Sequence, residues 1–370
     1  MSIILSALAF LILLTLLVMI HEVGHFLAAR KMGVKVEEFG FGLPPRVKTL
    51  FWQGGTRFSF NWIPFGGFVR LQGEASTTEK QRTAKGSFGS VPVGARILIL
   101  IAGVVMNFLF ALLIFAIGFS VGRWIPTYLS YEEMEAARAH GDISYEPAVI
   151  IDAVVPDGEA SRAAVPVPSI LLSVDGTTVA DPASVPELQK GKQVVLYALL
   201  TGKKFAERRT MVVPVREGKT GVSLGFYPKD LQAPRRGPVD ALRLSLREAG
   251  VLVVQNVKGV GVLFRSLLVS LRVPAGITGI VGIARYTHAS VQEGWMVYLQ
   301  LMAQLSLSLA ILNILPIPAL DGGRLLFVLI EAVQRRPLNR KFEAVTNTVG
   351  FALLLLLILV ITYHDVLRLF

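Results

Sequence analysis

The sequence IILSALAFLILLTLLVMIHEVGHFLAAR, residues 3–30, decides the fold of this chain. No charged side chain occurs between residues 3 and 20, and an apolar run of about 18 or more residues is typical of a membrane-spanning helix. We therefore predict a span over residues 3–28. Ionisable side chains cost about 2.5–3.5 kcal/mol each near the bilayer centre, so the polar residues that end this run need a functional explanation.

The segment HEVGH at residues 21–25 supplies that explanation. A helix turns by about 100° per residue, so His21 and His25 lie one turn apart on one face and can both reach one metal ion. Glu22 lies beside that face. H-E-x-x-H on a helix is typical of zinc hydrolases, in which the histidines bind the metal and the glutamate is the general base. A catalytic zinc site has three protein ligands, so one more must come from elsewhere.

The composition favours a membrane protein with a soluble insert. Of the 370 residues, 53% are hydrophobic and 17% are charged, and the mean hydropathy is positive. The net charge of +11 fits cytoplasmic loops and lipid-facing surfaces, and we predict no nucleic-acid partner. The lack of cysteine excludes disulfides, thiolate metal sites and a cysteine nucleophile. The first span has no basic start, and its hydrophobic stretch runs into charged sequence without an A-x-A-like cleavage site, so we predict that it is retained.

Charge and alternation describe the segment after the first span. Residues 30–96 carry eleven Lys or Arg against four Glu, so the positive-inside rule places this segment in the cytoplasm and the N-terminus outside. Alternation over residues 57–62, after the Gly54-Gly55 pair, predicts a β-hairpin over 34–71. This hairpin is either a small cytoplasmic element that touches lipid or protein, or a sheet beside the active site that pairs with an extended substrate.

The middle of the chain changes character twice. Residues 95–121 predict a second span, with Gly103 allowing close helix approach and Asn107 forming an interhelical hydrogen bond. Residues 124–228 predict a compact β-rich domain outside the membrane. Charges interrupt residues 238–292, and we interpret them as the solvated face of an amphipathic helix at the outer interface or along the bundle. The predicted strands of the β-rich domain are 148–155, 170–174, 194–200, 210–215 and 222–226, with a helix over 185–189.

A third span over about residues 295–333 is broken in an unusual way. Pro316 and Pro318 remove backbone donors and interrupt the helix, and Asp321 follows directly. A basic loop and a fourth span centred on 351–361 come next, which places the C-terminus outside.

Asp321 is the best candidate for the third zinc ligand. It follows the proline pair directly inside the predicted third span, and its side chain and that of Glu22 would both lie near the cytoplasmic side. The alternative is that Asp321 caps a broken helix or pairs with Arg324. The remaining histidines have no partner at ligand spacing, and we interpret them as ordinary surface residues: His140, His288 and His364.

Two paired motifs resemble those of the bacterial site-2 proteases, intramembrane zinc metalloproteases, of the branch that cuts anti-sigma factors. The family's H-E-x-x-H matches residues 21–25. Its N-x-x-P-x-x-x-L-D-G matches residues 313–322, including Asn313, Pro316 and Asp321. Residues 155–176 also resemble the signature of a PDZ domain, and only one such domain fits.

The resemblance implies a polytopic α-helical membrane protein with four transmembrane helices, a membrane-associated β-hairpin sheet and one inserted PDZ-like β-rich domain. Its parts would be residues 1–123, with the hairpin at 34–71, then 124–228 and 229–370. The resemblance implies Zn²⁺ on His21, His25 and Asp321 and Glu22 as the catalytic base. Asn313, Pro316 and Pro318 would bind the unwound substrate.

The resemblance also implies partners and a location. The substrates would be single-pass membrane proteins, such as an anti-sigma factor or signal-peptide remnants, trimmed first by a site-1-type protease. The enzyme would lie in the lipid bilayer of the bacterial cytoplasmic membrane, with both termini and the PDZ domain outside and the active site near the cytoplasmic side. Two other functions remain open at this point: a catalytically silent receptor that binds peptides through its PDZ domain, and a zinc transporter.

Overall fold

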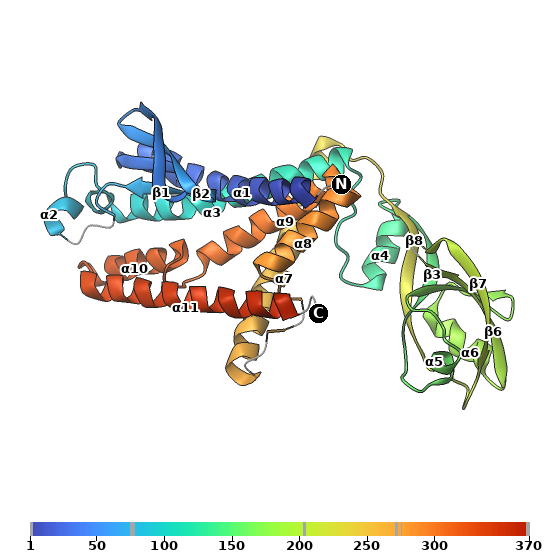
Figure 1. The fold of residues 1–370 in the computed structure, drawn as a ribbon. Helices are drawn as coiled ribbons and strands as arrows, with labels where there is room; N and C mark the ends of the chain where they lie inside the picture. The colour runs from blue at the N-terminus through green and yellow to red at the C-terminus, as the bar shows by residue number, and fades with distance from the viewer. Residues whose placement is uncertain (1–2, 75–77, 203–204, 271–272, 275, 368–370) are drawn as a thin grey trace. The chain divides into compact units, whose positions relative to one another are not determined.

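The computed structural model describes residues 3–74, 78–202, 205–270, 273–274 and 276–367. The chain divides into two compact units (Figure 1). One unit holds the residues up to Thr127 together with those from Arg235 onward, and the other is Tyr128–Pro234.

Long helices make up most of the first unit, and five of them are long and apolar enough to cross a membrane. The chain is thus a multi-pass integral membrane protein with a separate β-rich unit. The count of four spans is not confirmed, because α7 also meets this criterion of length and composition. The helices of this unit with at least eight residues are α1 Ile3–Lys31, α3 Val93–Val121, α7 Pro238–Ser270, α8 Ile280–Glu293, α9 Trp295–Ile314, α10 Asp321–Gln334 and α11 Arg340–Leu367; all but α8 and α10 are candidate spans.

The expectation for residues 238–292 requires a correction. We predicted a solvated charged face, but Glu248 in α7 is only 3% exposed. Its carboxylate accepts hydrogen bonds from the backbone N–H of Thr127, at 2.8 Å, and from the Thr127 hydroxyl, at 2.7 Å. A carboxylate that accepts two hydrogen bonds can be buried in a packed helix. The composition of the segment does not show that Glu248 has these donors. Residues 271–272 and 275 of this segment lie outside the described residues.

The predicted third span is two helices rather than one. Helix α9 ends at Ile314 and α10 begins at Asp321. Pro316 lacks a backbone N–H, and it disfavours helical geometry at the residue before it, which here is the extended C-cap Leu315. Side chains at Gly322 and Gly323 would overlap backbone atoms of the loop that joins the helices. This tight return brings the first turn of α10 back towards the end of α9.

The core of the first unit forms where α3 packs between α1 and α9. Its buried side chains include Leu13, Phe115, Phe119, Trp124 and Leu307. Helices α1 and α3 approach closely because Gly24 lies against the backbone of Ala102 and Gly103 lies against the HEVGH motif. The two glycines allow a backbone separation that larger residues would prevent.

The β-hairpin consists of β1 (Val36–Gln53) and β2 (Thr56–Leu71), paired antiparallel. Its turn is Gly54-Gly55, where both residues have positive φ (56° and 79°), a conformation that glycine adopts without strain. β2 packs against α1, with Gly67 against Met19. Aromatic side chains elsewhere on the hairpin are exposed, and Trp62 is 69% exposed.

The second unit is built on an antiparallel sheet with strand order β7-β6-β4-β3-β8, and β5 pairs with β4. Its core includes Val149, Ile151, Leu171, Tyr197 and Leu199. We expected one helix in this region, and the described residues contain two more, α4 and α5. The elements are α4 Tyr131–Ala139, β3 Ser144–Val154, α5 Glu159–Arg162, β4 Ser169–Val174, β5 Thr177–Thr178, α6 Val185–Gln189, β6 Val194–Thr201, β7 Glu207–Pro214 and β8 Val222–Gln232.

A buried carboxylate ties α10 to the first turn of α3 and to Arg82, which precedes that helix. Glu331 accepts hydrogen bonds from Arg82, at 2.8 Å, Arg96, at 2.6 Å, and the backbone N–H of Leu338, at 3.0 Å. Arg324 of α10 pairs in the same way with Glu74. These contacts join segments about 250 residues apart in the sequence.

Glu331→Gln should lower the stability of the first unit. Glutamine keeps the shape but removes the charge that two guanidinium groups share, and a buried donor that loses its partner costs about 1–3 kcal/mol. Thermal unfolding in detergent micelles should show a lower midpoint. Glu187→Gln is the control, because its pair with Lys190 is exposed, 4.0 Å long and contributes little. Equal midpoints for the two variants would contradict the expectation.

Candidate metal centre

Helix α1 places the two motif histidines on one face, as the spacing requires. The Nε2 atoms of His21 and His25 are 3.1 Å apart, and their rings meet edge to face with centroids 4.7 Å apart. His21 is 5% exposed and His25 is 8% exposed. Two buried imidazole nitrogens therefore point at one small volume.

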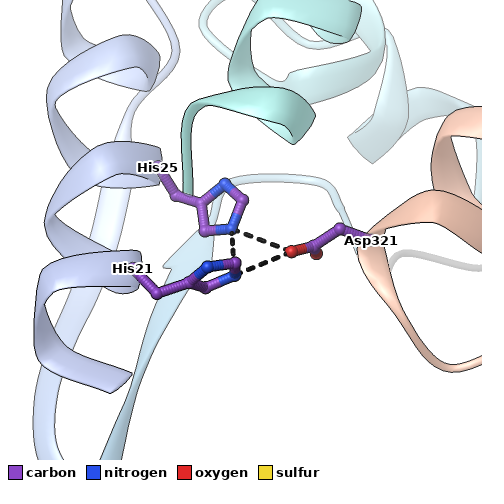
Figure 2. Close-up of side chains that lie close together, drawn as sticks. All are labelled: His21, His25 and Asp321. Atoms are coloured by element: carbon purple, nitrogen blue, oxygen red, sulfur yellow. Dashed lines mark hydrogen bonds and ion pairs between the residues drawn. The ribbon is translucent and has the colours of Figure 1, made fainter. Parts of the chain in front are cut away.

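Asp321 brings a carboxylate to the same volume from the first residue of α10 (Figure 2). Its Oδ2 lies 2.8 Å from Nε2 of His21 and 3.2 Å from Nε2 of His25. The alternative partner, Arg324, instead pairs with Glu74. The proline-broken loop thus directs Asp321 towards the histidines across about 300 residues of sequence.

The three side chains fit a zinc ion. Each offers one ligand atom, and these atoms lie within 4.8 Å of one another. Zinc binds histidine nitrogen and carboxylate oxygen at about 2.0–2.2 Å in tetrahedral sites, which separates neighbouring ligands by about 3.3–3.6 Å. The observed separations are slightly shorter, so a small outward shift of the side chains accommodates the ion. Among the described residues, this is the group of acidic and histidine side chains that could hold a metal.

Helix α3 supports the two histidines from behind. Nδ1 of His25 lies 2.8 Å from the backbone carbonyl oxygen of Ile99, so this nitrogen donates and leaves Nε2 as the ligand atom. One turn further, Gly103 faces both imidazoles. No sequence pattern marks the contact of Ile99, because any residue has a carbonyl group, and we predicted a role for Gly103 only in helix packing.

Gly103→Ala should disrupt the centre. A Cβ atom at this position would lie 2.5 Å from Nε2 of His25 and 2.7 Å from Cε1 of His21, so at least one ring must move away from the metal position. Zinc content after purification should fall, as measured by elemental analysis. Gly250→Ala is the matched control, since a Cβ there meets nothing within 4 Å. Full zinc in Gly103→Ala would contradict this expectation.

The other predicted site residues differ in whether they contact the histidines. The half-buried Glu22 lies beside the backbone of Val69 in β2. The side-chain amide nitrogen of Asn313, near the end of α9, is 3.5 Å from Nε2 of His21. Pro318 packs against Gly350 of α11, whereas Pro316 is exposed. The structure therefore brings Asn313 to the centre and places the prolines in the loop that shapes it.

A metal-binding H-E-x-x-H helix, completed by an acid from a second helix inside a bundle of apolar helices, defines the class of membrane-embedded metalloproteases. Residues 9–357 match the family model of peptidase family M50. The chain belongs to that family, the site-2 protease family, which confirms the resemblance at the level of the family.

Relatives similar over nearly their whole length support the same assignment. A protein of Fusobacterium nucleatum, assigned by name as a zinc metalloprotease, is 32% identical over 367 residues, covering 97% of this chain and 98% of the relative. Similarly named proteins of Clostridium perfringens and Rhizobium meliloti are each 29% identical, covering 99% and 96% of this chain and 98% and 95% of the relatives. The chain is thus a zinc metalloprotease of the intramembrane type, and zinc is its cofactor.

Proposed function

We propose that this enzyme hydrolyses peptide bonds within the transmembrane segments of single-pass membrane proteins, with zinc held by His21, His25 and Asp321. The observation that carries the proposal is the convergence of these three side chains between α1 and α10 in a unit of apolar helices. Ionisable groups at membrane depth are costly, and a metal ion that all three bind accounts for that cost.

Glu22 is the general base of the proposed reaction. Zinc, when bound, acidifies a water molecule and polarises the scissile carbonyl. Glu22 takes the proton from the attacking water and later donates it to the leaving amine. Glu22 follows His21 directly on α1 and lies beside Val69 of β2, and its carboxylate is not one of the three grouped ligand atoms.

Substrate handling follows from the state of the substrate backbone. The amides of a membrane helix are shielded by their own hydrogen bonds, so the substrate must unwind before attack. Asn313, 3.5 Å from His21, would hold the unwound segment through its amide, and the loop with Pro316 and Pro318 would shape the channel beside it. β1 or β2 of the hairpin would offer an edge strand for pairing.

The proposed topology follows the charge distribution. Four spans, formed by α1, α3, the α9–α10 pair and α11, would place both termini outside the bacterial cytoplasmic membrane and the zinc centre near the cytoplasmic side. The β-rich unit would be a PDZ-like domain outside, which admits substrates already trimmed by a site-1-type protease. An anti-sigma factor or signal-peptide remnants fit this substrate class.

Substrate trapping tests the proposal. The Glu22→Gln variant is expressed in native membranes, crosslinked and purified, and bound proteins are identified by mass spectrometry. We expect single-pass membrane proteins, which the wild-type enzyme then cleaves within their apolar segment after co-reconstitution in vesicles. Capture of peptides without any cleavage by the wild-type enzyme would favour a silent receptor, and zinc flux into the vesicles would favour a transporter. Either result would overturn the proposal.

A further inference from the structure

One ring nitrogen at the centre lacks a hydrogen-bond partner within the part of the chain that the structure describes. Nδ1 of His25 donates to the carbonyl of Ile99, but Nδ1 of His21 is buried and has no partner among the described residues. A histidine that binds a metal through Nε2 carries its proton on Nδ1, and this N–H nearly always donates a hydrogen bond to an acceptor that orients the ring. His21 therefore needs an acceptor that the HEVGH motif does not supply.

The side chain of Asn107 in α3 is a second group without a partner. Asn107 is 0% exposed, and neither its Oδ1 nor its Nδ2 makes a hydrogen bond within the described residues. The side-chain bond between helices that we predicted for this residue is therefore not formed within the described residues. Instead, the backbone carbonyl of Asn107 accepts from the hydroxyl of Ser306 in α9, at 2.8 Å. Buried amide groups without partners are rare and need an explanation.

Helix geometry directs the side chain of Asn107 towards Gly103, and Gly103 lies against the ring of His21. Residues 103 and 107 lie one turn apart on the same face of α3, and helical side chains lean towards the N-terminal turn. The amide of Asn107 therefore extends over the turn that contains Gly103. Because Gly103 has no side chain, the position its Cβ would take is only 2.8 Å from Nδ1 of His21. No side chain at residue 103 therefore separates the amide of Asn107 from the ring of His21.

We propose that Asn107 is a positioning residue of the zinc centre. Its Oδ1 accepts a hydrogen bond from the Nδ1–H of His21, directly or through one water molecule, and so orients the ring with the lone pair of Nε2 towards the metal position. Ile99 and Asn107 then orient one histidine each, from positions two turns apart on α3. This inference rests on the proposed role of His21 as a zinc ligand.

Zinc affinity, measured by competition with a chelator in detergent, tests the proposal. All proteins carry Glu22→Gln, so that cleavage does not affect the readout. Asn107→Leu keeps similar volume and removes the acceptor, and we expect zinc binding to weaken about 10–100-fold. Asn107→Ala should weaken it similarly and only removes atoms, so it covers the case in which leucine prevents folding. Asn107→Asp retains an acceptor and should restore binding.

Two controls separate this proposal from the assignment on which it rests. Ser306→Ala removes the bond to the Asn107 carbonyl but leaves the amide intact, so zinc affinity should stay within about twofold of the parent. His21→Ala should lose zinc altogether. Unchanged affinity in both Asn107→Leu and Asn107→Ala, with zinc lost in His21→Ala, would overturn the role of Asn107 alone. Zinc retained in His21→Ala would instead overturn the ligand assignment.

Discussion

Glu22→Gln should lower the rate of intramembrane cleavage by about 10²–10⁴-fold, the usual contribution of a general base. Glutamine has nearly the shape of glutamate but cannot take a proton from water at neutral pH. Because Glu22 is not among the three converging ligand atoms, zinc should remain bound. The measurement is single-turnover cleavage of a membrane substrate in vesicles, with zinc determined by elemental analysis on the same sample.

The pair of readouts makes the experiment specific to the base. Glu37→Gln is the control, since Glu37 is an exposed residue at the base of the hairpin, and it should cleave at the wild-type rate. Cleavage by Glu22→Gln at the wild-type rate would exclude Glu22 as the base. If the variant lost both zinc and activity, Glu22 would be a residue that binds the metal and not the residue that takes the proton from water.

Asp321→Ala should abolish stable zinc binding. The variant leaves two histidines, whose Nε2 atoms are 3.1 Å apart, without the carboxylate that lies within 3.2 Å of both. Two neutral nitrogens bind the ion far more weakly than a set that includes an anion, and a catalytic site needs three protein ligands. Zinc remaining after extensive dialysis, measured per polypeptide, should fall close to the background.

The same variant tests the structural alternative for this acid. If Asp321 only began α10, its loss would lower helix stability without removing metal. Asp240→Ala is the matched control, because Asp240 occupies the first turn of α7 and is exposed. Undiminished zinc in Asp321→Ala would mean that the third ligand is another residue.

Much of the fold could be predicted because its signals are local. The uncharged run before His21, the alternation over residues 57–62 and the glycine pair at 54–55 each specify their own secondary structure. The environment of residues 238–292 could not be predicted in the same way. A charged residue such as Glu248 is expected to be solvated unless its hydrogen-bond partner, Thr127, is known. The break in the third span was expected, but its outcome as two helices depended on glycines packed against the loop.

The sequence by itself determined the chemistry of the site: two histidines and a glutamate at helical spacing, an acid after a proline-broken span, and the membrane around them. Only the tertiary structure decided that Asp321 contacts the histidines and does not pair with Arg324. It also decided that Ile99 and Gly103 contact the two histidine rings. The physical reason is that periodicity reports neighbours one turn away, whereas these contacts join residues from 74 to 300 positions apart. Such contacts exist only once α1, α3 and α10 pack together.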